Sequence, residues 1–311
     1  MTIRWRGRHY FDNLAVGSLE GYGVKEYGTI YYVDTVNGSD SNSGLNWDVA
    51  LATVEEAFAK VGDNGLIAII GDVREQITAP LGVTGVKVVG VAGGRNRHDD
   101  GVRWREPATA LDAPLVTIRQ QGWEFHNILF VPQDGYSAIR AHRAESTTYP
   151  DSSHFIVKNC KFIGGAAIGS QAGIGIEDWG GNHHYLVEDC EFHELDNAIV
   201  APSGSPGIAA PLRNTIKNCI FEDNVDDICM DGNLCRILNN IFMTPYGTKN
   251  HDNTVNMAYV TDVSGANFVI GNIFADATAN VTIAKGYGPS TGDVWRNFVT
   301  DAADPVVAVP S

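Results

Sequence analysis

The sequence predicts an all-β fold in the form of a single parallel β-helix, in which short strands wind into stacked coils. Three observations support this prediction. A unit made of a polar residue or Gly, two further residues and then Phe recurs at intervals of 21 to 32 residues. A second apolar segment usually follows each unit after seven to nine residues. The 34 Gly residues, with only 19% charged residues, suit many tight turns between short strands.

Composition narrows the function classes. The chain has 311 residues, 44% of them hydrophobic, and a formal net charge of −15. This content is enough for a sizeable core, and the acidic balance argues against a broad basic face for nucleic acid. No stretch approaches the roughly 18 apolar residues of a membrane span, and residues 1–11 lack the apolar core of a secretory signal. We therefore expect no signal peptide, no membrane span and no nucleic-acid partner.

The N-terminal residues 1–28 form a separate arm in this prediction. They hold four basic and three acidic residues, a net charge of +1, so residues 29–311 carry −16. Basic and aromatic side chains alternate near the start, which favours docking onto an acidic or apolar partner surface. A frayed terminus is the alternative. The candidate attachment residues are Arg4, Trp5, Arg6, Arg8, Tyr10 and Phe11.

The coil begins with a strand, a loop and a helix. Residues 31–34 are typical of a strand, residues 37–44 (NGSDSNSG) of a loop, and residues 53–61 (TVEEAFAKV) of a helix that caps the open end of the coil. Thr53 and Glu56 predict a capping box at its start. Asp34 and Asp40 could bind Ca²⁺, although the loop lacks the glutamate-terminated spacing of an EF-hand. We expect no other cofactor.

The β-helix domain is predicted to span residues 29–303, and residues 304–311 form a short C-terminal tail. In residues 215–221 (TIKNCIF), strand alternation places Asn218 and Ile220 on one face and Cys219 and Phe221 on the other. The second apolar strands are centred on Ile139, Ile199, Ile228 and Ile283.

Equivalent residues of successive coils should form ladders. Cys160, Cys190 and Cys219 occupy the same place in three units, which predicts an interior stack topped by Asn240 and Asn272 rather than a metal site. A second ladder should lie at the turns, where Asn and Asp tolerate left-handed backbone. Its members are Asn127, Asn159, Asp189, Asn218 and Asn239.

Two segments carry a resemblance to known proteins. Residues 31–61 (YYVDTVNGSDSNSGLNWDVALATVEEAFAKV) resemble the entry segment of right-handed parallel β-helix proteins of the pectate-lyase-like superfamily. This resemblance implies a right-handed coil, but the superfamily includes lyases, hydrolases, epimerases, adhesins and phage proteins. Residues 85–94 (GVKVVGVAGG), followed by TIRQQGWEFHNILF, are similar to β-helix proteins of phage particles.

An enzyme of this superfamily would need acidic residues across the scissile bond. Of the motifs that polygalacturonase-type hydrolases share, the sequence offers an Asp-Asp pair but neither Gly-His-Gly nor Arg-Ile-Lys. A lyase would need a cluster of basic residues, which is not apparent. We favour no residue as catalytic, and the fallback candidates are Glu177, Asp178, Asp226, Asp227 and Asp231.

Residues 175–184 (GIEDWGGNHH) form the segment richest in chemistry. Trp179 is flanked by Glu177 and Asp178, with His183 and His184 close behind, and the segment could be a sugar-stacking platform with an acid and a base. Packing of Trp179 on the coil or on a neighbouring subunit is the alternative, which we favour.

These observations lead to an expectation of function. The chain is expected to be a phage virion protein, assembled in the host cytoplasm, that decorates the capsid or forms part of a tail spike. The arm would bind other virion proteins, and the resemblance implies a homotrimer. The alternative is a glycoside hydrolase or lyase acting on host surface polysaccharide.

Overall fold

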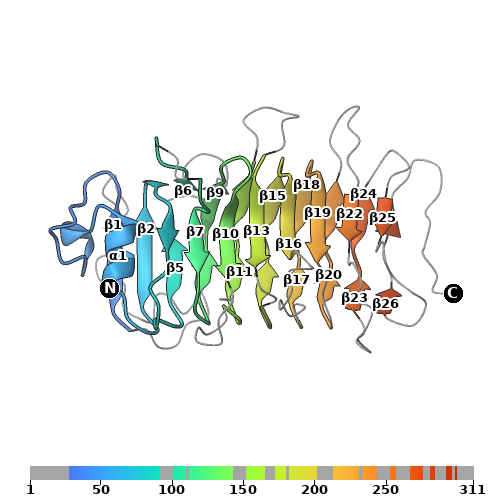
Figure 1. The fold of residues 1–311 in the computed structure, drawn as a ribbon, viewed down its shortest axis with the longest axis horizontal. Helices are drawn as coiled ribbons and strands as arrows, with labels where there is room; N and C mark the ends of the chain where they lie inside the picture. The colour runs from blue at the N-terminus through green and yellow to red at the C-terminus, as the bar shows by residue number, and fades with distance from the viewer. Residues whose placement is uncertain are drawn as a thin grey trace, which may run out of the picture.

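Short strands stack side by side along the long axis of the molecule, and helix α1 (Val54–Lys60) lies at the N-terminal end of the stack (Figure 1). This computed structural model describes residues 28–91, 101–109, 112–142, 152–164, 172–179, 182–201, 213–230, 234–243, 253–256, 267–275, 281–283, 292–295 and 298–299. The predicted arm and tail lie outside these ranges, apart from Gly28. In the described part of the chain the strands form three sheets in which every strand pairing is parallel, the arrangement of a parallel β-helix.

The first sheet has ten strands in the described residues and receives one strand from each coil. It consists of β1 (Ile30–Asp34), β2 (Leu66–Ile70), β5 (Lys87–Gly90), β8 (Glu124–His126), β11 (Ile156–Lys158), β14 (Leu186–Glu188), β17 (Thr215–Lys217), β20 (Arg236–Leu238), β23 (Asn267–Ile270) and β26 (Gly292–Trp295).

The second sheet follows the first after a sharp corner, and nine of its strands are described. It consists of β3 (Asp72–Arg74), β6 (Val102–Arg105), β9 (Ile128–Val131), β12 (Lys161–Ile163), β15 (Glu191–His193), β18 (Ile220–Glu222), β21 (Ile241–Met243), β24 (Ile273–Ala275) and β27 (Phe298–Val299).

The third sheet completes each coil with eight described strands. It consists of β4 (Ile77–Thr78), β7 (Val116–Ile118), β10 (Ser137–His142), β13 (Ile174–Trp179), β16 (Asn197–Ala201), β19 (Asp226–Met230), β22 (Asn253–Asn256) and β25 (Val281–Ile283). The predicted second strands are confirmed here, because Ile139, Ile199, Ile228 and Ile283 all belong to this sheet.

The structure corrects the predicted alternation within each unit. We expected one strand through residues 215–221, but β17 and β18 belong to different sheets. Asn218 lies between them with φ 55°, in the left-handed region. The chain turns there, so Cys219 and Phe221 are buried like Ile216, whereas Asn218 is exposed and Ile220 is only half-buried. The polar residue is therefore a corner between two strands, not the centre of one.

The predicted corner ladder is confirmed. Five Asn and Asp side chains occupy this corner with φ between 53° and 57°: Asn127, Asn159, Asp189, Asn218 and Asn239. Gly271, with φ 70°, takes the same place one coil later. Neighbouring rungs touch, because the Asn159 amide donates to Asn127 Oδ1. In each of these coils, one residue with left-handed backbone turns the chain from its strand in the first sheet to its strand in the second sheet.

Columns of like side chains fill the interior. Consecutive rings of Phe130, Phe162, Phe192, Phe221 and Phe242 stack with centroids 4.7 to 5.2 Å apart. Rings that lie nearly parallel at this spacing contribute dispersion and apolar burial at every coil.

The predicted cysteine stack is also confirmed. Cys160, Cys190 and Cys219 are free and buried. Burial raises the pKa of the Cys219 thiol well above its usual value, so it stays protonated and donates weakly to backbone carbonyls. As expected, Asn240 follows in the column and its Oδ1 accepts from the Cys219 amide at 2.9 Å. Asn272 repeats this bond to Asn240.

Helix α1 covers the N-terminal end of the interior, as predicted, although its capping box is incomplete. Thr53 Oγ1 accepts from the Glu56 amide, but the Thr53 amide donates to Asp40 and the Glu56 carboxylate pairs with Lys60. Phe58 projects from the helix onto Trp123, with ring centroids 5.0 Å apart. The helix therefore shields the first coil from water and from other strands.

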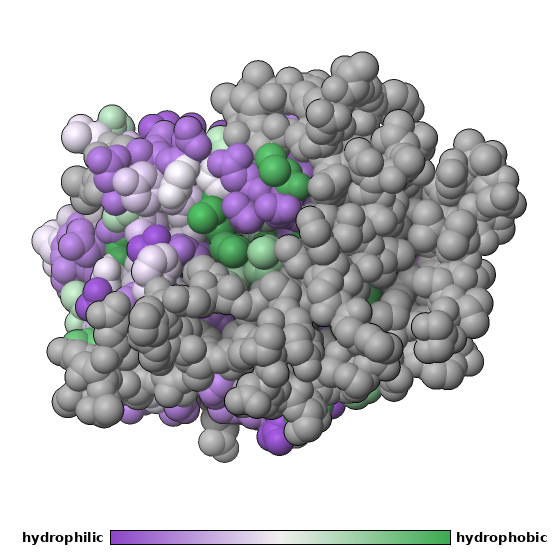
Figure 2. Space-filling view, turned by 45° about the vertical axis from the view of Figure 1, so that its right-hand side comes forward, coloured by the Kyte–Doolittle hydropathy of each residue, from purple (hydrophilic) through white to green (hydrophobic). Residues whose placement is uncertain are grey.

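The visible surface of the described residues is mainly hydrophilic, with a small hydrophobic group near its centre (Figure 2). No helix in the described ranges is long and apolar enough to cross a membrane.

Candidate functional site

The third sheet brings together Arg140, Glu177 and Trp179, two of which the sequence singled out. Arg140 of β10 is paired in register with Glu177 of β13, and His142 with Trp179. Arg140 Nε donates to Glu177 Oε2 at 2.7 Å, and Ser137 Oγ donates to the same oxygen at 2.8 Å. The Arg140 guanidinium carbon lies 5.1 Å from the centre of the Trp179 ring. The three side chains form one cluster, which we call the Arg–Glu–Trp cluster.

Burial decides what this cluster can do. The Glu177 side chain is 6% exposed and that of Arg140 is 26% exposed. Glu177 Oε2 already accepts hydrogen bonds from a guanidinium and a hydroxyl, so this carboxylate serves to hold the two strands together. The accessible parts are the guanidinium and the indole. A cation beside an aromatic face suits binding of a polar ring better than proton transfer.

Asp178, the neighbour of Glu177, faces the opposite way. It is fully buried, and its Oδ1 accepts from the Asn182 backbone amide at 2.9 Å and from the Asn182 side chain at 2.6 Å. Asn182 Oδ1 in turn accepts from the Ser152 amide. Alternation along β13 thus separates the two carboxyl groups, and Asp178 braces the corner between the third and first sheets.

The two predicted histidines belong to that corner. His184 is exposed, has φ 59°, and stacks on His154 of the preceding coil with centroids 5.0 Å apart and planes 7° apart. The His183 amide donates to Ser153 Oγ. His184 is therefore part of a second left-handed ladder, which the sequence did not reveal because its members are chemically dissimilar. The members are Asn64, Gly85, Gly122, His154, His184, Arg213 and Leu234.

The Asp226–Asp227 pair is split in a similar way. Asp226 is half-buried and pairs in register with Asn197. Asp227 is 1% exposed, and its Oδ1 accepts from Asn224 Nδ2 at 3.0 Å. Asp231, the last fallback candidate, lies outside the described residues.

The two candidate Ca²⁺ ligands bond to backbone amides of the entry loop. Asp34 accepts from the amides of Val36 and Asn37, and Asp40 accepts from those of Ala52 and Thr53. In the described part of the chain no group of three or more His, Cys, Asp or Glu side chains is arranged to hold a metal ion. Both carboxylates act as braces that order the loop before α1.

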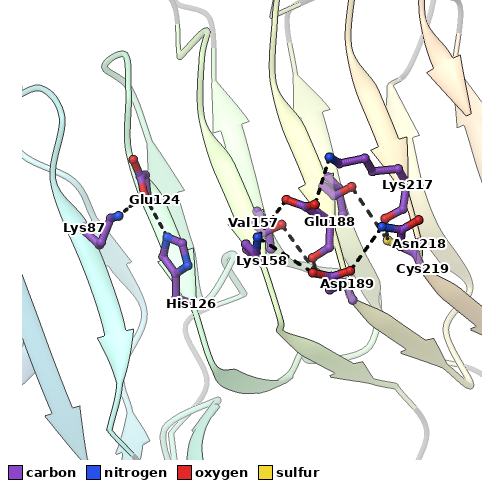
Figure 3. A network of polar contacts seen from close by, with 12 residues as sticks. Lys87, Glu124, His126, Val157, Lys158, Glu188, Asp189, Lys217, Asn218 and Cys219 are labelled. Carbon is purple, nitrogen blue, oxygen red and sulfur yellow. Dashed lines mark hydrogen bonds and ion pairs between the residues drawn. The ribbon is translucent and has the colours of Figure 1, made fainter. Parts of the chain in front are cut away.

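A polar band on the first sheet was missed by sequence reasoning (Figure 3). Glu124 Oε2 lies 2.7 Å from Lys87 Nζ and 2.8 Å from His126 Nε2. Burial alone would raise the pKa of Glu124, but hydrogen bonds with His126 and Lys87 outweigh it and lower that pKa. Farther along, Glu188 bridges Lys158 at 3.0 Å and Lys217 at 2.9 Å.

This band consists of complementary charges on successive coils. Lys158, Glu188 and Lys217 are register partners on β11, β14 and β17. The clue in the sequence is a Lys or Glu just before three successive corner residues, Asn159, Asp189 and Asn218, but the unequal coil lengths hide the register. Because its charges satisfy one another, the band stabilises the stacking of coils.

The six candidate attachment residues, Arg4, Trp5, Arg6, Arg8, Tyr10 and Phe11, lie outside the described residues.

Comparison with known proteins finds likeness in structure alone. No protein-family model matches the chain, and no curated protein matches it. Pectate lyase Pel9A is 15% identical with a TM-score of 0.47, over 91% of this chain and 82% of the lyase. A rhamnogalacturonan lyase is 11% identical with a TM-score of 0.44, over 87% of each chain.

A third similar structure, a pectin methylesterase from Aspergillus niger, is 13% identical with a TM-score of 0.44, over 90% of this chain and 88% of the esterase. At these values the likeness assigns neither a reaction nor a substrate. The three all-parallel sheets themselves define the fold as a parallel β-helix.

Proposed function

We propose that the protein is a non-catalytic structural β-helix on the surface of a bacteriophage particle, attached through its N-terminal arm. The absence of catalysis is proposed because the candidate carboxyl groups are ion-paired or buried. Glu177 is ion-paired with Arg140, and Asp178 and Asp227 lie in the interior. A glycosidase needs two carboxyl groups facing one bond. The described candidates offer no such pair.

The phage part of the proposal rests on the sequence. Residues 85–94 and the following TIRQQGWEFHNILF resemble phage β-helix proteins, and the basic, aromatic arm suits docking onto a particle surface. A coil braced by ladders of aromatic rings, amides and ion pairs suits a rigid element, since each coil stacks directly on its neighbours. A homotrimer of parallel coils belongs to the same proposal.

Incorporation into particles tests the proposal. Replacement of Arg4, Arg6 and Arg8 by Ala should leave a folded coil but strongly reduce the amount of protein that co-sediments with particles. Arg119→Ala, which removes an exposed arginine of the coil, is the matched control and should incorporate normally. Normal incorporation of the triple variant and of a chain lacking residues 1–28 would disprove attachment through the arm.

A second candidate function is favoured by the Arg–Glu–Trp cluster. Its guanidinium carbon lies 5.1 Å from the centre of the indole ring, and the two groups would contact a sugar ring of a host surface polysaccharide. The alternative is therefore an enzyme acting on such glycans, in which this cluster supplies the sugar contact. Incubation with a broad glycan panel should release no reducing ends. Release that disappears in Glu177→Gln but persists in Glu222→Gln, a carboxylate of the second sheet, would replace the structural proposal with the enzymatic one.

A further inference from the structure

The interior holds one carboxyl group at a position that other coils fill with small residues. Asp227 directly precedes Ile228, which pairs with Ile199 and so aligns with Ile176 and Ile139 in earlier coils. The residues that precede those isoleucines are Ala138, Gly175 and Ala198. A Cβ atom placed on Gly175 would lie 3.0 Å from the Phe192 ring, so this ladder position faces the interior.

The buried carboxyl group of Asp227 has few hydrogen-bond partners. Its Oδ1 accepts one hydrogen bond, from Asn224 Nδ2, and its buried Oδ2 has no partner among the described residues. Asn224 is committed elsewhere as well, since it also donates to the Phe192 carbonyl and accepts from the Leu195 amide. A neutral carboxyl tolerates such a site far better than a carboxylate does.

Among the described residues, the strands around Asp227 supply no counter-ion. Its own strand supplies Asp226, whose negative charge opposes ionisation. The adjacent strands β16 (NAIVA) and β22 (NTVN) contain no ionisable residue. Burial raises the pKa of Asp227 to about 8, the hydrogen bond from Asn224 opposes this rise, and the charge of Asp226 adds to it.

We propose that Asp227 is a proton-dependent joint of the coil, which holds β19 against β16 while its carboxyl is protonated and loosens that rung when it ionises. In a solenoid each coil contacts only its neighbours, so a weak rung divides the molecule into blocks. The joint would let the coils from β19 onward open, with β16 exposed at the break, while the coils before β16 stay folded.

The sign of the pH dependence follows from linkage. An aspartate in an unfolded chain has a pKa of about 4, below that in the folded coil. The contribution of the protonated group is therefore complete below about pH 4, declines as the pH rises, and is lost once the pH passes about 8. The unfolding constant should rise by up to about tenfold per pH unit within this window.

Denaturant unfolding and amide hydrogen exchange of the full chain between pH 5 and 9 test the joint. In the wild type, β16 and β19 should lose protection relative to β8 and β11 as the pH rises, after correction for intrinsic exchange rates. Asp227→Asn and Asp227→Ala should remove this local loss; Ala is the residue found in two earlier coils. Asp189→Asn is the matched control, because Asn fills that corner in neighbouring coils.

The outcomes are distinct. A local loss of protection that persists in both Asp227 variants would overturn the proposal. So would failure of both variants to fold at pH 5, because the group would then be required for its hydrogen bond and not for its proton. The same local loss disappearing in Asp189→Asn would assign the effect to another carboxylate.

Discussion

Asn218 illustrates how single residues set the course of this coil. Its φ of 55° costs an ordinary residue free energy, while Asn bears it through local hydrogen bonding and Gly bears it without a side chain. Its exposed side-chain amide lies 3.5 Å from Asp189 Oδ1, which is long for a hydrogen bond. The backbone conformation of Asn218 therefore matters more than this side-chain contact.

This distinction predicts opposite outcomes for two small substitutions. Asn218→Ala should lower the free energy of unfolding by about 1–2 kcal/mol, because Ala is strained in the left-handed region. Asn218→Gly should be close to neutral, as Gly271 occupies the equivalent corner. Urea unfolding compares the two. Equal losses for Ala and Gly would show that the amide contacts, not the backbone, hold the corner.

Buried asparagines solve a second local problem, the backbone groups that corners leave unpaired. Asn240 Oδ1 accepts from the Cys219 amide, and its Nδ2 donates to the Ile216 carbonyl at 3.2 Å. Asn182, Asn214 and Asn224 bind the preceding coil in the same manner at the other corners.

Replacement of Asn240 tests this role. An unsatisfied buried polar group costs about 1–3 kcal/mol. Asn240→Ala should therefore lower the free energy of unfolding in urea by at least that amount. A decrease below about 0.5 kcal/mol would contradict this role.

Among the elements, helix α1 has the clearest separate task. It ends the stack by placing Phe58 against Trp123 and against Trp104, whose ring centroid lies 6.4 Å away. Val54 and Ala57 are buried beside it. The helix thus replaces the coil that would otherwise continue the interior.

Truncation of Phe58 tests this task. Phe58→Ala should cost about 3–5 kcal/mol through lost burial and a cavity next to two tryptophans. Glu55→Ala, on the exposed side of the same helix, is the control and should change stability little. Both are measured by denaturant unfolding with tryptophan fluorescence. A small loss for Phe58→Ala would mean that α1 does not seal the interior.

The elements also show what the sequence could and could not predict. The recurring Phe and the polar residue three positions before it predicted the coils, the corner ladder and the cysteine stack. The split of each unit into two strands was missed, because alternation was extended through Asn218 as though it had strand geometry. The Arg–Glu–Trp cluster depended on the pairing of Arg140 with Glu177, and coils of unequal length do not reveal that register.

Seen as a whole, the molecule combines an acidic surface with ion pairs along its sheets. On the second sheet, His193 lies 3.0 Å from Glu222 and 3.4 Å from Glu191, and Lys161 lies 3.4 Å from Glu191. On the first sheet, Glu188 is shared by two lysines, and their hydrogen bonds lower its pKa despite the opposing effect of burial. These carboxylates support the stack, which agrees with a structural role for the coil.

The most direct test of the proposed virion role is whether purified bacteriophage particles contain the chain. Immunolabelling and quantitative mass spectrometry should find the chain at one defined place on the particle and in a fixed ratio to the major capsid protein. Its absence from intact particles, together with release of reducing ends from a host glycan by the free protein, would contradict the structural assignment and support an enzyme.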